Sequence, residues 1–194
     1  MIVWCDRDGT LIEQEDMKYV LTPDDLFMLP GAAESIAMLQ RAGLTVCVVT
    51  NQGGINEGFM SACDYKPIHD KMVKAVMEAG GKEFSSFICP HRKEDHCDCR
   101  KPRSGLLHYS AGVFREDPLH GWMIGDFWSD IIAAKNISLD IKAILVQTGR
   151  GKDAENETWF RRYGVYPDYI VEDIQAAAVK ILYGDYAEKP LTQW

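Results

Sequence analysis

Short apolar runs alternate with segments of helical pattern along the whole chain. The apolar, β-prone stretches predict six strands, at residues 1–5, 44–49, 84–89, 122–124, 143–146 and 168–171. The helical patterns between them predict five helices, at residues 32–42, 65–79, 105–114, 129–136 and 174–183. In the second of these helices, Ile68, Met72, Val73 and Val76 recur at the spacing of one helix face.

The run LTVCVV at residues 44–49 is apolar at almost every position. Such a run is expected of a parallel strand that is covered on both faces. Alternating strands and helices imply an α/β protein with a doubly wound parallel sheet and helices on both of its faces. The chain has no internal repeat and no linker-like stretch, so we predict a single domain over residues 1–194.

Polar clusters follow three of the predicted strands. They lie at residues 6–10 after the first strand, 50–54 after the second and 125–126 after the fourth. In a doubly wound sheet, ligands bind beyond the carboxyl ends of the strands. One cleft can therefore collect all three clusters, and this agreement carries more weight than any single motif.

Asp6 and Asp8 are two carboxylates just past the first predicted strand. A turn at Gly9 would bring both toward the cleft, because glycine accepts a positive φ angle without penalty. One aspartate can act as a nucleophile and the other as a proton donor. Like charges so close repel each other, so we expect a cation between them, with Asp126 as a further ligand. Oxygen ligands of this kind suit Mg²⁺.

Thr50 and Lys101 complete the candidate chemistry. Thr50 could hydrogen-bond a phosphoryl oxygen, and Lys101 would supply the positive charge that a transferring phosphoryl group needs. Each of these features has an ordinary structural explanation when it is taken alone. Asp-x-Asp-Gly is often a turn, and Thr50 would be an ordinary loop start. Asp126 would cap a helix, and Lys101 would be a solvated surface charge. Their joint occurrence in this order, at strand ends, is much harder to explain by turns.

Three cysteines and a histidine cluster within residues 89–99, in a spacing that is typical of a closed four-coordinate zinc site. The candidate ligands are Cys89, His91, Cys97 and Cys99. Three free thiols beside a surface histidine fit poorly, because residues 92–96 are too polar for a core. His96 is a possible substitute ligand, but it sits inside the loop next to a cysteine, so His91 is preferred. A closed ligand set predicts a structural zinc that braces the loop delivering Lys101.

Composition and charge narrow the classes of function. Hydrophobic residues make up 46% and charged residues 26% of the chain, as in ordinary globular proteins. The net charge of −8 argues against a nucleic-acid partner and against an anionic membrane surface. No apolar run approaches the about 18–20 residues that span a bilayer, and acidic residues come too early for a signal peptide. We therefore expect a cytoplasmic protein with reduced cysteines.

Four motifs together resemble those of the haloacid-dehalogenase (HAD) phosphatases. They are Asp6-Arg7-Asp8-Gly9-Thr10, Thr50 at the end of an apolar strand, Lys101, and Gly125-Asp126-Phe127-Trp128-Ser129-Asp130. Within that superfamily, Thr50-Asn51-Gln52, Cys89-Pro90-His91, Cys97-Asp98-Cys99-Arg100-Lys101-Pro102 and Thr148-Gly149 resemble the D-glycero-D-manno-heptose 1,7-bisphosphate 7-phosphatases. The histidinol-phosphatases share the zinc cysteines, and histidinol phosphate is the alternative substrate.

The resemblance implies a role for each matching position. Asp6 would attack phosphorus and carry an aspartyl-phosphate, and Asp8 would protonate the leaving alkoxide and then deprotonate a water. Thr50 and Lys101 would bind the phosphoryl oxygens. The implied substrate contacts are Asn51 and Arg100. The implied reaction is hydrolysis of a small phosphorylated sugar or polyol.

The resemblance also implies the ligands of a catalytic Mg²⁺. They are the Asp6 carboxylate, the Asp8 backbone carbonyl and Asp126. The role of Asp130 stays open, because it could orient Lys101, orient a metal-bound water or cap the following helix.

The gaps in which HAD enzymes insert a cap domain hold only residues 11–29 and the zinc loop, so we expect a capless enzyme whose pocket walls are loops. The chain also departs from the heptose branch. Ile12 stands where asparagine is usual, and Glu57 replaces a positive charge, which should disfavour a second phosphate nearby. The catalytic set is intact, so these departures affect the substrate rather than the reaction class.

Two non-phosphatase interpretations remain. A catalytically dead HAD-like scaffold would be expected to lack Asp6, Asp8 or Lys101, and the chain has all three. A zinc-dependent binding module could use residues 89–99 to read nucleic acid, but the acidic balance and the scarcity of flanking aromatic residues oppose it.

Overall fold

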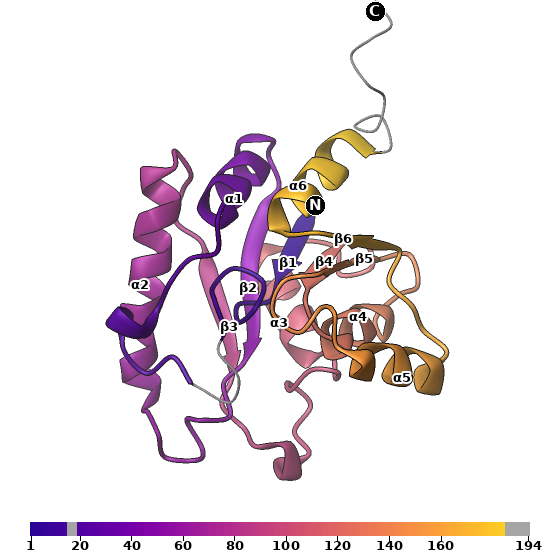
Figure 1. Ribbon diagram of the computed structural model, residues 1–194, viewed down its shortest axis with the longest axis horizontal. Helices are drawn as coiled ribbons and strands as arrows, with labels where there is room; N and C mark the ends of the chain where they lie inside the picture. The colour runs from indigo at the N-terminus through magenta and orange to yellow at the C-terminus, as the bar shows by residue number, and fades with distance from the viewer. Residues whose placement is uncertain (15–18, 185–194) are drawn as a thin grey trace, which may run out of the picture.

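The computed structural model describes residues 1–14 and 19–184, in which a six-stranded parallel sheet carries helices on both faces (Figure 1). The strands are β1 (Ile2–Cys5), β2 (Thr45–Asn51), β3 (Ser85–Cys89), β4 (Gly121–Gly125), β5 (Lys142–Val146) and β6 (Tyr169–Val171). The helices are α1 (Ala32–Arg41), α2 (Ala62–Glu78), α3 (Gly105–Phe114), α4 (Trp128–Lys135), α5 (Ala154–Tyr163) and α6 (Ile174–Tyr183). Short 3₁₀ turns lie at η1 (Pro23–Asp25) and η2 (Lys93–Asp95). The predicted α/β class with a doubly wound parallel sheet is confirmed.

The strand order is β3-β2-β1-β4-β5-β6, and every neighbouring pair is parallel. The chain winds from β1 outward to β3, then returns to the other side of β1 as β4. The direction of winding therefore reverses between β1 and β4, and sheets of this kind bind ligands beyond the strand ends at that point. Asp6 follows β1 there, and Asp126 follows β4.

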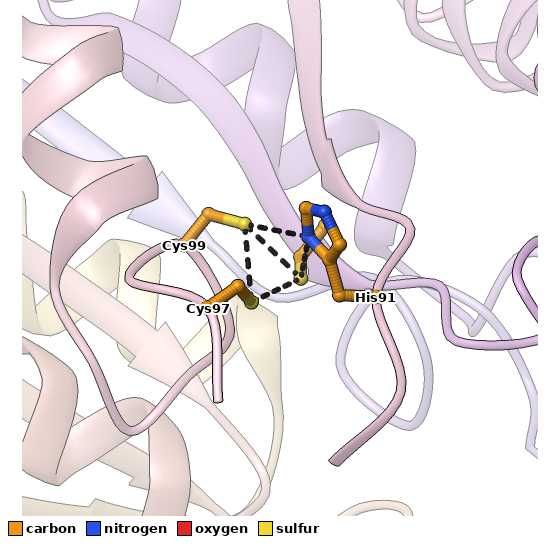
Figure 2. Close-up of side chains that lie close together, drawn as sticks. His91, Cys97 and Cys99 are labelled. Atoms are coloured by element: carbon orange, nitrogen blue, oxygen red, sulfur yellow. Dashed lines mark hydrogen bonds between the residues drawn. The ribbon is translucent and has the colours of Figure 1, made fainter. Parts of the chain in front are cut away.

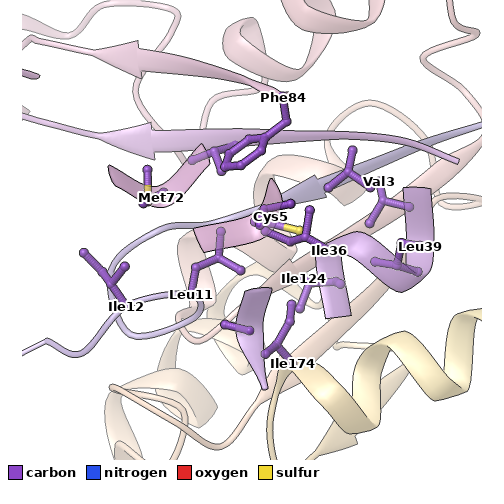
Figure 3. Packing of buried hydrophobic residues seen from close by; sticks show 14 of the residues in the cluster. Val3, Cys5, Leu11, Ile12, Ile36, Leu39, Met72, Phe84, Ile124 and Ile174 are labelled. Carbon is purple, nitrogen blue, oxygen red and sulfur yellow. The ribbon is translucent and has the colours of Figure 1, made fainter. Parts of the chain in front are cut away.

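Strand β1 is buried on both faces, which explains why its sequence is apolar throughout. Val3 and Cys5 belong to the core cluster beneath α1, α2 and α6 (Figure 3), whereas Ile2 and Trp4 belong to the cluster beneath α3, α4 and α5. All four side chains are fully buried. Because successive side chains of a strand point to opposite faces, two covered faces demand a continuous apolar run.

Helix α5 is absent from the elements that the sequence predicted. Its sequence AENETWFRRY is mostly polar, and only Asn156 and Phe160 are buried. An apolar repeat of helical period is therefore missing. Its ends do carry helix signals, since Asp153 precedes it and Gly164 follows it in the left-handed conformation.

Two predicted boundaries were wrong in ways that have a physical cause. Helix α2 begins at Ala62 rather than at residue 65, because Ser61 caps it and the Asp64 carboxylate accepts from the Ser61 N–H at 2.7 Å. Strand β2 runs on through Thr50 and Asn51, which pair with β3, so both residues belong to the strand rather than to the loop after it.

The positions at which a cap domain could be inserted are occupied by short segments in the described chain. Residues 19–31 contain only the η1 turn, and residues 90–104 contain only η2. Within residues 1–14 and 19–184, every helix is too short or too polar to cross a bilayer.

Candidate active site

Lys101 lies buried at the carboxyl ends of the central strands. Its Nζ lies 2.7 Å from Asp6 Oδ1 and 2.6 Å from Asp130 Oδ1, and it donates a hydrogen bond to the Val49 carbonyl at 2.8 Å. Asn51 fixes the Lys101 backbone from both sides: its Nδ2 donates to the Lys101 carbonyl at 3.1 Å and its Oδ1 accepts from the Lys101 N–H at 3.0 Å. The ammonium group is therefore held in one place.

Asp130 is fully buried and makes two contacts at once. Oδ1 pairs with Lys101, while Oδ2 accepts a hydrogen bond from the Phe127 N–H at 3.1 Å at the start of α4. Of the three roles left open by the sequence, the structure therefore shows two together, orientation of the lysine and capping of the helix.

The carboxylates of Asp6, Asp126 and Asp130 converge, with ligand oxygens that all lie within 4.8 Å of one another. Burial, followed by the Asp130 carboxylate, raises the pKa of Asp6 to about 7. Burial and the Asp6 carboxylate raise the pKa of Asp126 well above its usual value. Burial by itself lowers the pKa of Lys101, but the carboxylates of Asp130 and Asp6 outweigh burial and raise it.

One buried ammonium group faces three carboxylates in this cluster, so a further cation would relieve the remaining repulsion. Hard oxygen donors from Asp6 and Asp126 fit Mg²⁺. The residues present are therefore suited to the metal that the sequence predicted.

Two glycines make room for the Asp126 carboxylate. A Cβ atom at Gly9 or at Gly149 would collide with Asp126 Oδ2, and both glycines have a positive φ, +76° and +49°. The same oxygen accepts a hydrogen bond from the Arg150 N–H at 2.7 Å, and Thr10 Oγ1 donates to Oδ1 at 3.4 Å. Loops after β1 and β5 thus close around a carboxylate that follows β4.

We predict that metal-free protein loses stability as the pH rises. The raised pKa of Asp6 means that its stabilising contribution is complete below the usual value of 3.8 and is lost as the pH rises through about 7. Mg²⁺ should offset this loss, so it should raise the melting temperature more at about pH 8 than at about pH 5. Thermal unfolding in EDTA and in Mg²⁺ checks this, and equal increases at both pH values would contradict it.

The Asp8 carboxylate lies apart from this cluster. It accepts hydrogen bonds from Arg7, Gln52 and Thr50 over distances of 2.7 to 3.3 Å. The sequence predicted Thr50 and Asp8 as site residues but missed Arg7 and Gln52. Arg7 lies between Asp6 and Asp8, and Gln52 follows Asn51. No local pattern in the sequence indicates that either side chain contacts Asp8.

A cavity of about 520 Å³ contains the candidate catalytic side chains. Its wall includes the predicted residues Asp6, Asp8, Thr50, Asn51, Arg100, Lys101 and Asp126. Basic side chains surround them, namely Arg92, Lys93, Arg103 and Arg150. In a chain of net charge −8, this cavity gathers positive charge where an anionic ligand would enter.

Arg100 lines the cavity, whereas Glu57 does not. Arg100 lines it while its Nη1 donates to the His91 carbonyl at 3.0 Å. Glu57, which was expected to oppose a second phosphate, is not among the lining residues; its carboxylate accepts from the Tyr19 hydroxyl at 2.9 Å. Sequence reasoning also missed the aromatic part of the wall, which consists of Phe127, Trp128 and Tyr163.

The four predicted zinc ligands meet in one cluster. Figure 2 labels three of them, His91, Cys97 and Cys99. The sulfur of Cys99 lies 3.3 Å from Cys89 Sγ, 3.4 Å from Cys97 Sγ and 3.2 Å from His91 Nδ1. Cys89 Sγ is 3.6 Å from Cys97 Sγ and 3.7 Å from His91 Nδ1. Ligands at about 2.0–2.3 Å from a tetrahedral zinc lie at similar separations from one another, so the donor set can hold that metal.

The cluster ties the end of β3 to the segment that carries Lys101. Cys89 is the last residue of β3. Farther along, the Arg103 side chain donates to the Cys97 carbonyl at 3.0 Å and also to the carbonyl of His96. His96, the substitute ligand considered above, is not in the cluster, and its backbone is left-handed with φ of 49°.

Two family models match the chain. The HAD-hydrolase-like model matches residues 98–177, and the polynucleotide kinase 3 phosphatase model matches residues 1–121. The two matches overlap in the segment that carries Lys101, and together they cover the segments that contribute Asp6, Thr50 and Asp126.

Several proteins named D-glycero-beta-D-manno-heptose-1,7-bisphosphate 7-phosphatase are similar to this chain. The one from Pseudomonas aeruginosa is 37% identical over 75% of this chain and 80% of its own length. The one from Bordetella bronchiseptica is 33% identical over 93% and 97%. A crystal structure of D,D-heptose 1,7-bisphosphate phosphatase from B. bronchiseptica, complexed with magnesium and phosphate, superimposes with a TM-score of 0.81 at 34% identity, over 93% of this chain and 97% of that one.

Proposed function

We propose that this protein removes a phosphate from a phosphorylated heptose in a Mg²⁺-dependent reaction. The chain belongs to the HAD-like family of D-glycero-beta-D-manno-heptose-1,7-bisphosphate 7-phosphatases. The observation that carries the proposal is the cluster of Asp6, Lys101 and Asp126 at the reversal point of the sheet. In a non-enzymatic scaffold, nothing would explain why Asp6 is held close to two other carboxylates that repel it and is paired with Lys101.

In the first half-reaction, an Asp6 oxygen forms a bond to phosphorus while the bond from phosphorus to the leaving alkoxide breaks. This yields an aspartyl-phosphate. Asp8 gives its proton to the alkoxide, and Lys101 with the Thr50 hydroxyl stabilises charge on the phosphoryl oxygens. Mg²⁺, held by Asp6, Asp126 and the Asp8 backbone carbonyl, would supply further positive charge at those oxygens.

In the second half-reaction, a water oxygen bonds to phosphorus and the bond to Asp6 breaks. Asp8, now ionised, takes the proton of that water. Inorganic phosphate leaves, and both aspartates return to their starting protonation states. A single side chain thus serves as acid and then as base, which requires that it stay close to the phosphorus throughout.

The cavity supports a substrate with two phosphates. Arg92, Arg100 and Arg103 line it in addition to the buried lysine, and guanidinium groups bind phosphate in a bidentate manner. The Glu57 carboxylate accepts a hydrogen bond from the Tyr19 hydroxyl and is not among the residues that line the cavity. Both features favour the bisphosphate over histidinol phosphate, which carries a single phosphate and a cationic amine.

Phosphate release from a panel of phosphomonoesters, in Mg²⁺ and in EDTA, tests the proposal. The panel contains heptose 1,7-bisphosphate, histidinol phosphate and a 3′-phosphorylated oligonucleotide. We expect Mg²⁺-dependent release with the highest kcat/KM on the bisphosphate, at its 7-position. Faster hydrolysis of histidinol phosphate would favour the alternative substrate. Absence of Mg²⁺-dependent release from every compound, under conditions in which a known relative is active, would refute the phosphatase assignment.

The Cys/His cluster is proposed to hold one structural Zn²⁺ per chain, because its four ligands leave no open position. We expect Cys97→Ser to lose the zinc, to lower kcat/KM by about 10- to 100-fold through displacement of Lys101, and to make residues 90–103 sensitive to protease. Mg²⁺ dependence should persist. Elemental analysis, kinetics and limited proteolysis measure these effects.

Cys63→Ser is the matched control for this variant, because Cys63 is an exposed thiol on α2, away from the cluster. The control should keep both zinc and activity. Protein purified without added metal that contains no zinc, or a Cys97→Ser variant with full zinc and full activity, would refute the structural role.

Two further properties belong to the same proposal. Helices on both sides of one continuous sheet support a single phosphatase domain over residues 1–194. Six cysteines without a disulfide among the described residues are compatible with a cytoplasmic location, which we propose on that basis.

A further inference from the structure

Arg7 is a fully buried cation beside the candidate nucleophile, at 1% exposure. Its Nη2 donates to Asp8 Oδ1 at 2.7 Å and its Nε donates to Asp8 Oδ2 at 3.1 Å, so Arg7 binds the carboxylate in a bidentate manner. The guanidinium carbon lies 5.3 Å from the centre of the Tyr65 ring. A buried ion pair is a weak source of stability, because desolvation consumes most of the attraction, so this arrangement calls for another explanation.

Gln52 is a second side chain that hydrogen-bonds the Asp8 carboxylate, and it is almost fully buried. Its Oε1 accepts from Arg7 Nη2 at 3.1 Å. Because arginine has only donors, this contact fixes the orientation of the amide and turns Nε2 toward Asp8. Nε2 donates to Asp8 Oδ2 at 2.9 Å and to Thr50 Oγ1 at 2.9 Å.

The two oxygens of Asp8 are therefore not equivalent. Oδ2 receives three donors, from Arg7, Gln52 and the Thr50 hydroxyl at 3.3 Å, which fill its acceptor positions. Among residues 1–14 and 19–184, Arg7 is the one side chain that donates to Oδ1, which leaves an acceptor position of this oxygen open. If Thr50 turns to bind a phosphoryl oxygen, two donors still occupy Oδ2, so the difference persists.

We propose that Arg7 and Gln52 are positioning residues that anchor Asp8 through Oδ2 and leave Oδ1 to exchange the catalytic proton. This inference rests on the proposed function. In the first half-reaction the proton passes from Oδ1 to the leaving alkoxide as its bond to phosphorus breaks, and in the second a water proton returns to Oδ1. The anchor holds one oxygen at the same place for both transfers, which an unrestrained carboxylate does not do.

Gln52→Leu tests the anchor, because it removes the amide donor at similar volume and leaves the charges intact. The measurement is kcat/KM for phosphate esters that range from p-nitrophenyl phosphate to alkyl phosphates, since kcat/KM reports the steps up to alcohol release. An alkoxide needs the proton, whereas p-nitrophenolate does not. We expect a loss of about 10- to 100-fold on alkyl phosphates and of less than about 3-fold on p-nitrophenyl phosphate.

Arg7→Lys is the second variant, because it keeps a buried cation while removing the bidentate hydrogen bonds to Asp8. It should show the same dependence on the leaving group. Gln40→Leu is the matched control: Gln40 bonds the Lys82 backbone, outside the cavity, and its loss should leave all esters unaffected. Thermal unfolding confirms that each variant is folded.

A purely structural role for Gln52 predicts an equal loss on every ester, because a smaller active fraction lowers all rates alike. An equal loss, or no loss on alkyl phosphates, would overturn the anchor while leaving the phosphatase assignment in place. If wild-type protein hydrolysed neither these esters nor heptose 1,7-bisphosphate in Mg²⁺, both the proposed function and the anchor would be refuted.

Discussion

Asp6→Asn is expected to lower kcat by a factor on the order of 10⁴ or more, because an amide cannot form the bond to phosphorus that the reaction requires. The fold should persist. Asp6, which is half-buried, and the buried Asp126 and Asp130 have ligand oxygens within 4.8 Å of one another, so removing the charge of Asp6 relieves repulsion in metal-free protein. Lys101 keeps its contact with Asp130 at 2.6 Å. In EDTA, loss of activity should therefore come without loss of melting temperature.

Steady-state phosphate release and thermal unfolding, both in Mg²⁺ and in EDTA, measure the two effects on freshly purified protein that is free of deamidation. Asp140→Asn is a suitable control, because Asp140 is exposed and lies outside the cavity. It should match wild type in both assays. Substantial residual activity in undeamidated Asp6→Asn would show that another group is the nucleophile.

Asp8→Asn is expected to slow the reaction by about 10²- to 10⁴-fold, because both half-reactions lose their proton carrier. The effect should be uneven. With p-nitrophenyl phosphate, whose leaving group needs no proton, the first half-reaction should continue and the second should stall. The variant should then release about one p-nitrophenolate per active site and pass into slow turnover.

Stopped-flow absorbance resolves such a burst, and wild type under the same conditions supplies the comparison. The amide oxygen that Asp8→Asn introduces can accept from Arg7 Nε and Gln52, but the new amide nitrogen then faces Arg7 Nη2, a second donor, so thermal unfolding is needed to show that the variant is folded. Wild-type rates in both phases would exclude Asp8 as the acid–base group.

The fold was predictable because its central strands are buried on both faces. β1 contributes Ile2 and Trp4 to one core cluster and Val3 and Cys5 to the other, and this double burial produces the apolar runs that predict parallel strands. Helix α5 was not predicted because it buries only Asn156 and Phe160, too few positions to produce an apolar repeat of helical period.

The Cys/His cluster was predictable for a different reason. Its four ligands lie within residues 89–99, so their spacing is visible without knowledge of the fold. The pairing of Lys101 with Asp130 and the grip of Gln52 on Asp8 join residues that are far apart in sequence. Only the sheet topology brings these together, and each side chain by itself looks like an ordinary loop or capping residue.

The contacts of Asn51 could not be predicted either. The sequence predicted a substrate contact, and Asn51 does line the cavity, but its side-chain amide holds the Lys101 backbone. A side chain that hydrogen-bonds another segment of backbone leaves no trace in local sequence pattern. Its predicted role toward the substrate stays a prediction.

Direct detection of the phospho-enzyme tests the central claim most sharply. Protein mixed with substrate and Mg²⁺ is quenched in acid within one turnover and treated with borohydride, which reduces an aspartyl-phosphate to homoserine. Peptide mass spectrometry then locates the modified residue. We expect homoserine at position 6, more of it in Asp8→Asn than in wild type, and none when Mg²⁺ or substrate is omitted. Turnover that proceeds without any modification at position 6, or with the modification at another residue, would contradict the assignment of Asp6 as the nucleophile.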